Sequence, residues 1–511
     1  MLAKITSSTV IGIEAIKVAV EIDVSGGLPG FSIVGLPDPA VRESINRVKS
    51  AVKNCGFKFP SRKITVNLAP ADIKKQGPSF DLPIALGILA ASGQINQEPL
   101  CGKVFCGELS LDGTLRPITG VLPRAMALRN SSYRQLLLPS DNAKEAAVVN
   151  DIEVLGLGNL AQTVSYLNNE IEITPTKVNI KNVWQENGSY EFDFSDVKGQ
   201  YHIKRGLEVA AAGGHNVLLI GSPGAGKTML AKCIPGILPQ MTHQEALETS
   251  KIHSVAGLIS NGKVIVSSRP FRAPHHSISD VALIGGGTHP KPGEISLSHN
   301  GVLFLDELPE FKRNVLEMLR QPLEAGQITV SRIASSVSYP ARFMLISACN
   351  PCPCGFFLDD SKQCHCTPNQ IQKYLSKISG PLLDRIDIHL EVPRLKYEQM
   401  TSKNKNENSQ EVRKRVNKAG KIQEKRLKKF KCCYNAHMYA RLVEKLCLLS
   451  KEAQDLLKMA ILDLGLSTRA YHRILRVSRT IADLDASETI ESEHISEAIS
   501  YRCLDRNLWA L

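Results

Sequence analysis

The spacing of hydrophobic and polar positions changes along the chain, and each spacing predicts a different kind of element. Residues 1–24 and 63–68 alternate between apolar and polar side chains, which is typical of strands with one buried face. Residues 40–55 have apolar side chains at helical spacing. Residues 1–170 therefore predict an α+β domain of short strands and helices.

Further along, three short apolar runs predict buried strands at 217–220, 301–305 and 343–346. The first has the length and composition of a strand in a parallel sheet. From about residue 411 to the end, glycine and proline are nearly absent, which favours helices. We expect an α/β region followed by a helical one.

A chain of 511 residues is too long for one ordinary domain, since domains have roughly 100–200 residues each. A polar stretch and a run without apolar residues indicate linkers. The predicted divisions are a domain at 1–170, a linker at 171–194, a core at 195–395, a basic linker or helix at 396–440 and a helical domain at 441–511.

The overall composition excludes several classes of protein. Hydrophobic residues make up 43% and charged residues 22%, as in globular proteins, so wholesale disorder is excluded. No apolar run approaches the length of a membrane span, and the amino terminus lacks the pattern of a signal peptide. We therefore expect a soluble, cytoplasmic protein, whose 13 cysteines are thiols or metal ligands.

The net charge of +12 is concentrated in one part of the chain. Residues 401–440 hold twelve lysines and arginines against three glutamates. This run indicates either a solvated basic helix beside a linker or a contact with the phosphate backbone of nucleic acid, bound without regard to its sequence.

The first apolar run leads directly into a glycine-rich phosphate-binding loop. Its pattern G-x-x-x-x-G-K-T lies between a predicted strand and a predicted helix, as the motif requires. Backbone N–H groups would surround the phosphates, with Lys227 on the β and γ phosphates and Thr228 on Mg²⁺. We predict ATP and Mg²⁺ as ligands of Gly221, Ser222, Pro223, Gly224, Ala225, Gly226, Lys227 and Thr228.

The second and third apolar runs end in polar residues that suit hydrolysis. Asp306 would complete the Mg²⁺ shell, and Glu307 would act as the general base on the attacking water. Asn350, just beyond the third run, can orient that water. Taken without the loop, the two acids could equally be solvated groups at the end of a strand.

An arginine on a short segment offers a further contact to the nucleotide. Arg385 lies in GPLLDRID and could be donated to the γ-phosphate of a neighbouring subunit, since arginine is always charged and binds bidentately. The alternative is an ion pair within the chain, with Asp384 or Asp387.

Two C-x-C pairs follow Asn350. Cys352, Cys354, Cys364 and Cys366 could supply four thiolates to a tetrahedral zinc ion, with Cys349 and His365 as spare ligands. The alternative is a loop of reduced thiols that packs beside the active site.

Together, the segments GSPGAGKT, GVLFLDELPEF, SACNPCPCG and GPLLDRIDIH resemble the magnesium-chelatase-like AAA+ ATPases, and more narrowly the YifB/ComM family. RPFRAPHHS, PKPGEISLSHNG and STRAYHRILRVSRTIADL extend the resemblance over essentially the whole chain. The resemblance implies an AAA+ module with a helical lid, assembled as a homo-hexameric ring and preceded by an α+β domain similar in fold to the Lon protease domain (ribosomal S5 domain 2-like). It also implies that Asn350 is the sensor 1 residue, Arg385 the arginine finger and Arg469 the sensor 2 arginine.

The resemblance also implies what the ring does. Residues 240–300 fit the insertion that this group carries in its second helix, and 327–342 resembles a hairpin that faces the pore in related ring helicases. ComM-type proteins are DNA branch-migration motors that act on incoming single-stranded DNA during natural transformation. An alternative is a chelatase-like subunit that drives metal insertion or remodels a protein client.

A serine in the amino-terminal domain is a candidate nucleophile. Residues 75–82 resemble the segment around the nucleophile of Lon-type Ser–Lys proteases, with Ser79 as the serine, but Leu122 stands where the lysine base is expected. Arg124 stays protonated and cannot replace that base, so we expect no proteolysis and a capping role for Ser79.

Arg473 and Arg476 share a helical face with Arg469 and could contact a neighbouring subunit, DNA or only solvent.

Overall fold

The computed structural model describes residues 1–129, 131–179, 190–259, 264–287, 290–332, 335–357, 359, 362–395, 406–430, 432–464 and 467–502. Two compact units make up the chain. The first comprises Met1–Asn187 and Ala246–Ser267, and the second comprises Gly188–Glu245 and Ser268–Leu511. Residues 246–267 fall inside the expected ATPase core yet belong to the first unit. Parts of both predicted linkers, at 180–189 and 396–405, lie outside the described residues.

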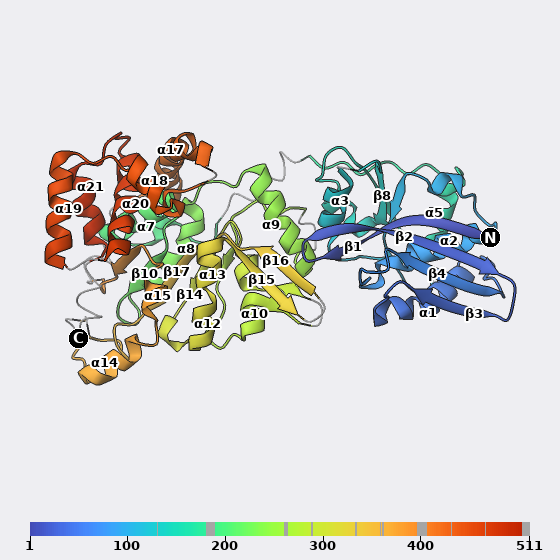
Figure 1. Ribbon diagram of the computed structural model, residues 1–511, viewed down its shortest axis with the longest axis horizontal. Helices are drawn as coiled ribbons and strands as arrows, with labels where there is room; N and C mark the ends of the chain where they lie inside the picture. Colours follow the sequence, from blue (N-terminus) through green and yellow to red (C-terminus); the bar gives the residue numbers. More distant parts are fainter. Residues whose placement is uncertain are drawn as a thin grey trace. The chain divides into compact units, whose positions relative to one another are not determined.

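The first unit is built on a seven-stranded mixed sheet in the order β3-β4-β2-β1-β5-β8-β9. A long antiparallel hairpin of β1 and β2 runs through it (Figure 1). The strands predicted at 1–24 and 63–68 are confirmed. The strands are β1 (Leu2–Ile11), β2 (Glu14–Ser25), β3 (Gly30–Val34), β4 (Lys63–Ala69), β5 (Lys103–Phe105), β8 (Gln135–Pro139) and β9 (Glu153–Leu157), with a separate pair, β6 (Glu108–Leu109) and β7 (Leu115–Arg116).

Helices cover this sheet, and the helix predicted at 40–55 is confirmed as α1 (Pro39–Asn54). The Asp38 carboxylate accepts a hydrogen bond from the Val41 N–H, which caps the first turn. α2 (Asp81–Ala91) is buried along its whole length and packs on β1 and β2. The others are α3 (Val121–Arg129), α4 (Ser140–Ala146) and α5 (Leu160–Leu167).

A five-stranded parallel sheet in the order β11-β14-β17-β10-β18 forms the centre of the second unit. All three predicted apolar strands lie in it, as β10, β14 and β17. Their residues are buried because helices and neighbouring strands cover them on both faces. The strands are β10 (Val217–Ile220), β11 (Phe271–Arg272), β14 (Val302–Leu305), β17 (Met344–Cys349) and β18 (Ile388–Glu391).

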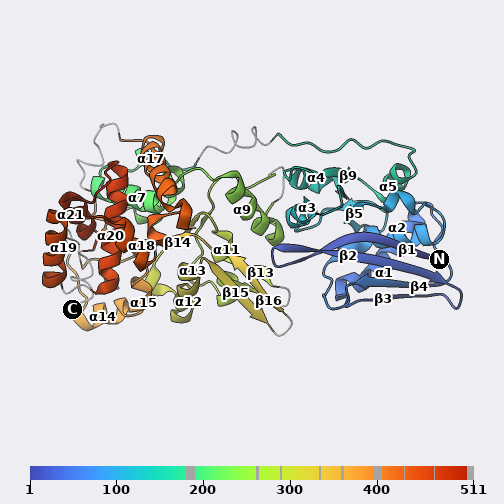
Figure 2. The same cartoon turned by 45° about the horizontal axis from the view of Figure 1, so that its top comes forward.

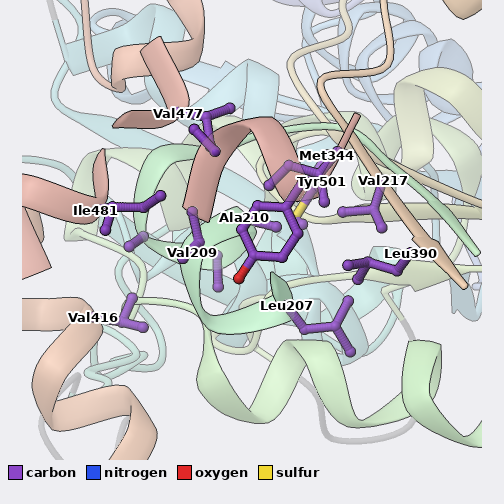
Figure 3. Packing of buried hydrophobic residues seen from close by; sticks show 14 of the residues in the cluster. Leu207, Val209, Ala210, Val217, Met344, Leu390, Val416, Val477, Ile481 and Tyr501 are labelled. Carbon is purple, nitrogen blue, oxygen red and sulfur yellow. The ribbon is translucent and has the colours of Figure 1, made fainter. Parts of the chain in front are cut away.

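α7 (Tyr201–Gly213) joins this sheet to the carboxyl-terminal helices. In Figure 3, Leu207 of α7 lies toward Leu390 of β18, and Val209 lies toward Val416 and Ile481 of the terminal helices. Gly206 lies so close to the sheet that an added Cβ would come within 2.6 Å of the Leu390 side chain. The second unit therefore has one continuous hydrophobic core.

The predicted helical character beyond residue 411 is confirmed in the described part of the chain. α19, α20 and α21 lie side by side (Figure 2), and α17 packs on α7, α8 and α20. The helices are α17 (Ser409–Leu427), α18 (Ala440–Leu446), α19 (Lys451–Leu464), α20 (Thr468–Leu484) and α21 (Ser492–Ser500). No helix among the described residues is long and apolar enough to span a membrane.

Short elements complete the second unit. The predicted hairpin at 327–342 is confirmed as β15 (Gln327–Arg332) and β16 (Ser335–Pro340), paired antiparallel with Val330 opposite Val337. The remaining elements are α8 (Lys227–Ile237), α9 (His243–Ala256), α10 (Asp280–Ile284), β12 (Gly285–Gly286), β13 (Lys291–Pro292), α11 (Glu294–Leu297), α12 (Arg313–Met318), α13 (Arg320–Ala325), α14 (Pro368–Leu375) and α15 (Gly380–Leu383). Residues 246–256 of α9 belong to the first unit.

Candidate nucleotide site

The phosphate loop connects β10 to the first turn of α8. Gly224 and Gly226 have φ values of +80° and +90°, and a Cβ on either would meet no heavy atom within 4 Å. A Cβ on Gly221, in contrast, would lie 2.3 Å from the backbone oxygen of Val392. The glycines thus allow a left-handed, open loop whose N–H groups can face an anion at the start of a helix.

Lys227 is the buried cation of this loop, with 9% of its surface exposed. Its ammonium group donates to the backbone oxygens of Gly221, at 2.5 Å, and Ser222, at 3.1 Å, and to Asn350 Oδ1, at 3.1 Å. Burial lowers the pKa of Lys227, and the charges of Asp306 and Glu307 oppose this shift. The lysine is therefore held in place before any phosphate arrives.

Three polar groups converge at the carboxyl ends of adjacent parallel strands. The phosphate loop follows β10, Asn350 follows β17 and Asp306 follows β14, and these strands are neighbours in the sheet. The Thr228 hydroxyl donates to Asp306 Oδ2 at 2.7 Å. A hydroxyl and a carboxylate this close are oxygen ligands of the kind that Mg²⁺ prefers, so the donor set fits that ion.

Glu307 is exposed and stands in an unusual backbone conformation. Its φ of +52° is rare for a residue with a side chain, and such strain is often found at functional sites. His276 Nδ1 lies 3.4 Å from Glu307 Oε2. The sequence offered His276 only as part of RPFRAPHHS, without a role, so its contact with the expected base was missed.

Arg385 lies at the opposite edge of the sheet. The Asn216 backbone oxygen, just before β10, accepts from the N–H groups of Asp387 and Ile388, and Asn216 Nδ2 donates to the Arg385 backbone oxygen at 2.8 Å. Arg385 therefore precedes the amino end of β18, whereas the phosphate loop follows the carboxyl end of its parallel neighbour β10. Four strand residues, about 13 Å, separate the two edges.

Arg469 lies beside Arg385 at that edge. Its side chain donates to Asp384 Oδ2 at 2.9 Å, and Arg473 Nη2 lies 3.4 Å from Asp384 Oδ1. Arg385 does form an ion pair within the chain, as the alternative expected, but the partner is Glu324, so the expected partners Asp384 and Asp387 are wrong. Its guanidinium also donates to the Pro381 backbone oxygen. The solvated alternative for Arg473 is also wrong, since Arg473 is 5% exposed.

The predicted cysteine cluster is brought together in the structure. The Sγ atoms of Cys352, Cys354, Cys364 and Cys366 all lie within 4.8 Å of one another. A tetrahedron of thiolates at about 2.3 Å from zinc has edges of about 3.8 Å. Three of the Sγ–Sγ distances are 3.3, 3.5 and 3.7 Å, so the donor set fits zinc. The spare candidates Cys349 and His365 are not members of the group.

In the described part of the first unit, Ser79 has no partner that could act as a general base. It is 3% exposed, and its Oγ accepts a hydrogen bond from Arg124 Nη2 at 3.1 Å. The predicted capping role of Ser79 is wrong: Phe80 precedes α2, whose amino end has no side-chain cap, and Ser79 lies in the 3₁₀ turn Pro78–Phe80. The Leu122 side chain is fully buried in the hydrophobic core.

The basic run at 401–440 divides into two groups of residues. Arg415 binds Glu208 and Glu407, and Arg426 binds Asp483, so these two cations hold α17 in place. The others on α17 that are exposed fall at spacings of three or four residues, on one face. They are Lys414, Lys418, Lys421 and Lys425. Lys403, Lys405 and Lys431 lie outside the described residues.

Comparison with family models matches three stretches of the chain. Residues 193–400 match "Magnesium chelatase, subunit ChlI", 20–142 match "Subunit ChlI of Mg-chelatase", and 406–502 match "Magnesium chelatase, subunit ChlI C-terminal". Together the matches extend over most of both units.

Several curated proteins are similar along the whole chain. "Competence protein ComM" of Haemophilus influenzae is 46% identical over 100% of this chain and 99% of its own length. "Uncharacterized protein YifB" of Escherichia coli is 44% identical over 98% of this chain and 96% of its own. The "Magnesium-chelatase 38 kDa subunit" of Rhodobacter capsulatus is 26% identical over 31% of this chain and 50% of its own.

Proposed function

Because the chain belongs to the YifB/ComM family of magnesium-chelatase-like proteins, we propose that it is an ATP-driven ring motor that moves branched DNA. One observation carries the proposal. Side chains suited to bind phosphate and magnesium gather at one edge of the parallel sheet, and two arginines suited to a nucleotide lie at the opposite edge.

Hydrolysis follows from the groups at the carboxyl edge. Lys227 and the loop N–H groups would bind the phosphates, and Thr228 and Asp306 would hold Mg²⁺, which would supply positive charge to offset that of the phosphates. Glu307 takes the proton of the attacking water, and Asn350 orients that water. His276 holds the Glu307 carboxylate in position before the nucleotide binds, because it lies against Oε2.

The opposite edge requires a second copy of the chain. Arg385 and Arg469 are too far from the phosphate loop of their own sheet, so they complete the site of the next subunit. Such a head-to-tail contact closes into a ring, which we propose to be a hexamer. A mixture of Lys227→Ala and Arg385→Ala chains should then recover ATPase activity that neither has alone. Absence of recovery in confirmed mixed rings would contradict the shared site.

DNA would be bound through backbone phosphates. The lysines at 414, 418, 421 and 425 present one charged face, and the hairpin β15–β16 is a candidate pore element. Binding of this kind weakens steeply as the salt concentration rises and depends little on sequence. The relative's name links it to competence, so we propose helicase-like branch migration on incoming single-stranded DNA during natural transformation, in the cytoplasm.

The amino-terminal domain, which we place at 1–170, is a Lon-like scaffold without protease activity. Its Ser79 binds the permanently protonated Arg124 and has no general base. The linker at 171–194, the core at 195–395 and the lid at 441–511 complete the proposed organisation. Structural zinc on the four cysteines is part of the proposal, because tetrahedral thiolate sites contribute directly to folding.

Purified protein with ATP, Mg²⁺ and labelled three- and four-way DNA junctions tests this function. We expect the wild type to resolve junctions only with ATP, and Lys227→Ala to be inactive. Lys232→Ala is the control, since Lys232 lies in the same helix over Phe192. Intact ATPase activity without junction processing would reject the DNA motor. It would favour the second candidate, a chelatase-like subunit that acts on metal insertion or a protein client, which the family models support.

A further inference from the structure

The loop that carries the four clustered cysteines packs against the phosphate loop. It begins at Asn350, which accepts a hydrogen bond from Lys227, and Cys352 follows two residues later. Gly355 has a φ of +85°, and a Cβ placed on it would lie 2.6 Å from Pro223 Cδ. The turn is closed by the Gly355 N–H, which donates to the Cys352 backbone oxygen at 3.0 Å. The position of Pro223 therefore depends on the turn that contains Cys352 and Cys354.

The same loop reaches Pro223 by a second route. Arg394 Nη2 donates to the Pro223 backbone oxygen at 3.2 Å. Its Nε lies 3.3 Å from Asp359 Oδ2, and its guanidinium lies 5.6 Å from the centre of the Phe356 ring. Phe356 and Asp359 belong to the segment between the two C-x-C pairs. Pro223 is thus held directly by Gly355 and indirectly, through Arg394, by residues that the cysteines tie together.

From these contacts we infer that metal bound by the cysteine cluster sets the affinity of the phosphate loop for nucleotide. Four thiolates on one ion would fix the cysteine loop, whose described residues between 352 and 366 lie in no helix or strand. Without the ion, the turn at Gly355 that packs on Pro223 and the segment that follows Asn350 would no longer be held together. The inference rests on the proposed ATPase and zinc sites and adds their coupling.

The first test compares metal content with nucleotide binding. Cys364→Ser should lose zinc, measured by atomic absorption, and bind a fluorescent ATP analogue at least about tenfold more weakly, which corresponds to about 1.4 kcal/mol. Cys433→Ser, an exposed thiol outside the cluster, should keep both properties of the wild type. A zinc-free Cys364→Ser protein that binds the analogue like the wild type would overturn the coupling.

A second variant separates coupling from metal loss and from misfolding. Gly355→Ala should retain one zinc per chain but weaken binding of the analogue by about tenfold, because its Cβ displaces Pro223. Gly56→Ala is the matched control, because Gly56 has a similar φ of +84° and a Cβ there meets nothing within 4 Å. Unchanged binding by zinc-loaded Gly355→Ala would also overturn the inference.

Zinc content and nucleotide affinity of the wild type distinguish failure of this inference from failure of the proposed ATPase function. Wild-type protein that holds no zinc, or whose nucleotide affinity is the same after chelation and after zinc is restored, refutes the coupling and leaves the ATPase proposal intact. A zinc-loaded wild type that binds no nucleotide would refute the proposed function itself.

Discussion

Two sites of this protein begin with similar short motifs but have different chemistry. Gly221-Ser222-Pro223 opens the phosphate loop, and Gly77-Pro78-Ser79 precedes α2 in the first unit. In the first site, Lys227 is held by neutral oxygens and lies near two carboxylates. In the second, Ser79 accepts a hydrogen bond from Arg124, which cannot act as a base. A serine nucleophile needs a neighbour that can accept its proton, whereas a phosphate site needs a held cation, so similar motifs suit different chemistry according to the partner residues.

Loss of Glu307, the proposed base, should give the largest effect. Glu307→Gln keeps the loop and should still bind ATP, but hydrolysis should fall by about 10²–10⁴-fold because the water loses its proton acceptor. Phosphate release and nucleotide binding would be measured together. Glu310→Gln is a matched control, since Glu310 pairs with Lys377 outside the site. Near-wild-type turnover by Glu307→Gln would refute the assignment.

Removal of Arg124 should show that the site around Ser79 has a structural role. Arg124→Ala leaves the Ser8 backbone oxygen and Ser79 Oγ without their buried donor, and should lower the free energy of unfolding by about 1–3 kcal/mol. ATP hydrolysis per folded molecule should not change. Arg129→Ala, on the exposed side of the same helix, should cost little. Loss of ATPase activity in folded Arg124→Ala would break the comparison.

Glu145 gives the first unit a pH dependence. Its carboxylate accepts from the Leu122 N–H and from the Ser254 hydroxyl of α9, and burial raises its pKa from the ordinary 4.5. The folded protein then holds this proton where the unfolded chain has released it, so stability falls as pH rises from about 4.5 through the folded pKa.

Replacement of Glu145 by glutamine should remove this dependence. Glu145→Gln should melt at a higher temperature than the wild type near neutral pH, and the difference should shrink as the pH falls below about 4.5. Melting curves across that range provide the measurement. Asp141→Asn, on the exposed first turn of the same helix, is the control. A difference in melting temperature between Glu145→Gln and the wild type that is the same at all pH values would contradict the prediction.

The smallest effect is expected from Ser79. Ser79→Ala removes one acceptor from Arg124 and should cost about 1 kcal/mol of stability. ATP hydrolysis should be unaffected, and a serine-reactive probe should label neither wild type nor variant. Labelling of the wild type that Ser79→Ala abolishes would revive a nucleophilic role.

By itself, the sequence determined the parts that depend on local pattern. Strands β10, β14 and β17 follow from short apolar runs, and helix α1 follows from its apolar spacing and the preceding Asp38. The spacing of the phosphate loop, together with Asp306 and Glu307, was also enough to predict a nucleotide site, because neighbouring parallel strands bring their carboxyl ends together.

Only the tertiary structure decided which distant residues meet. The contact of His276 with Glu307, the placement of Arg469 against Asp384 and the grouping of residues 246–267 with the first unit have no local signal in the chain. The two C-x-C pairs predicted four ligands, but not the packing of Gly355 on Pro223. Such contacts depend on how whole elements pack, and packing is set by the complete set of buried surfaces rather than by any one segment.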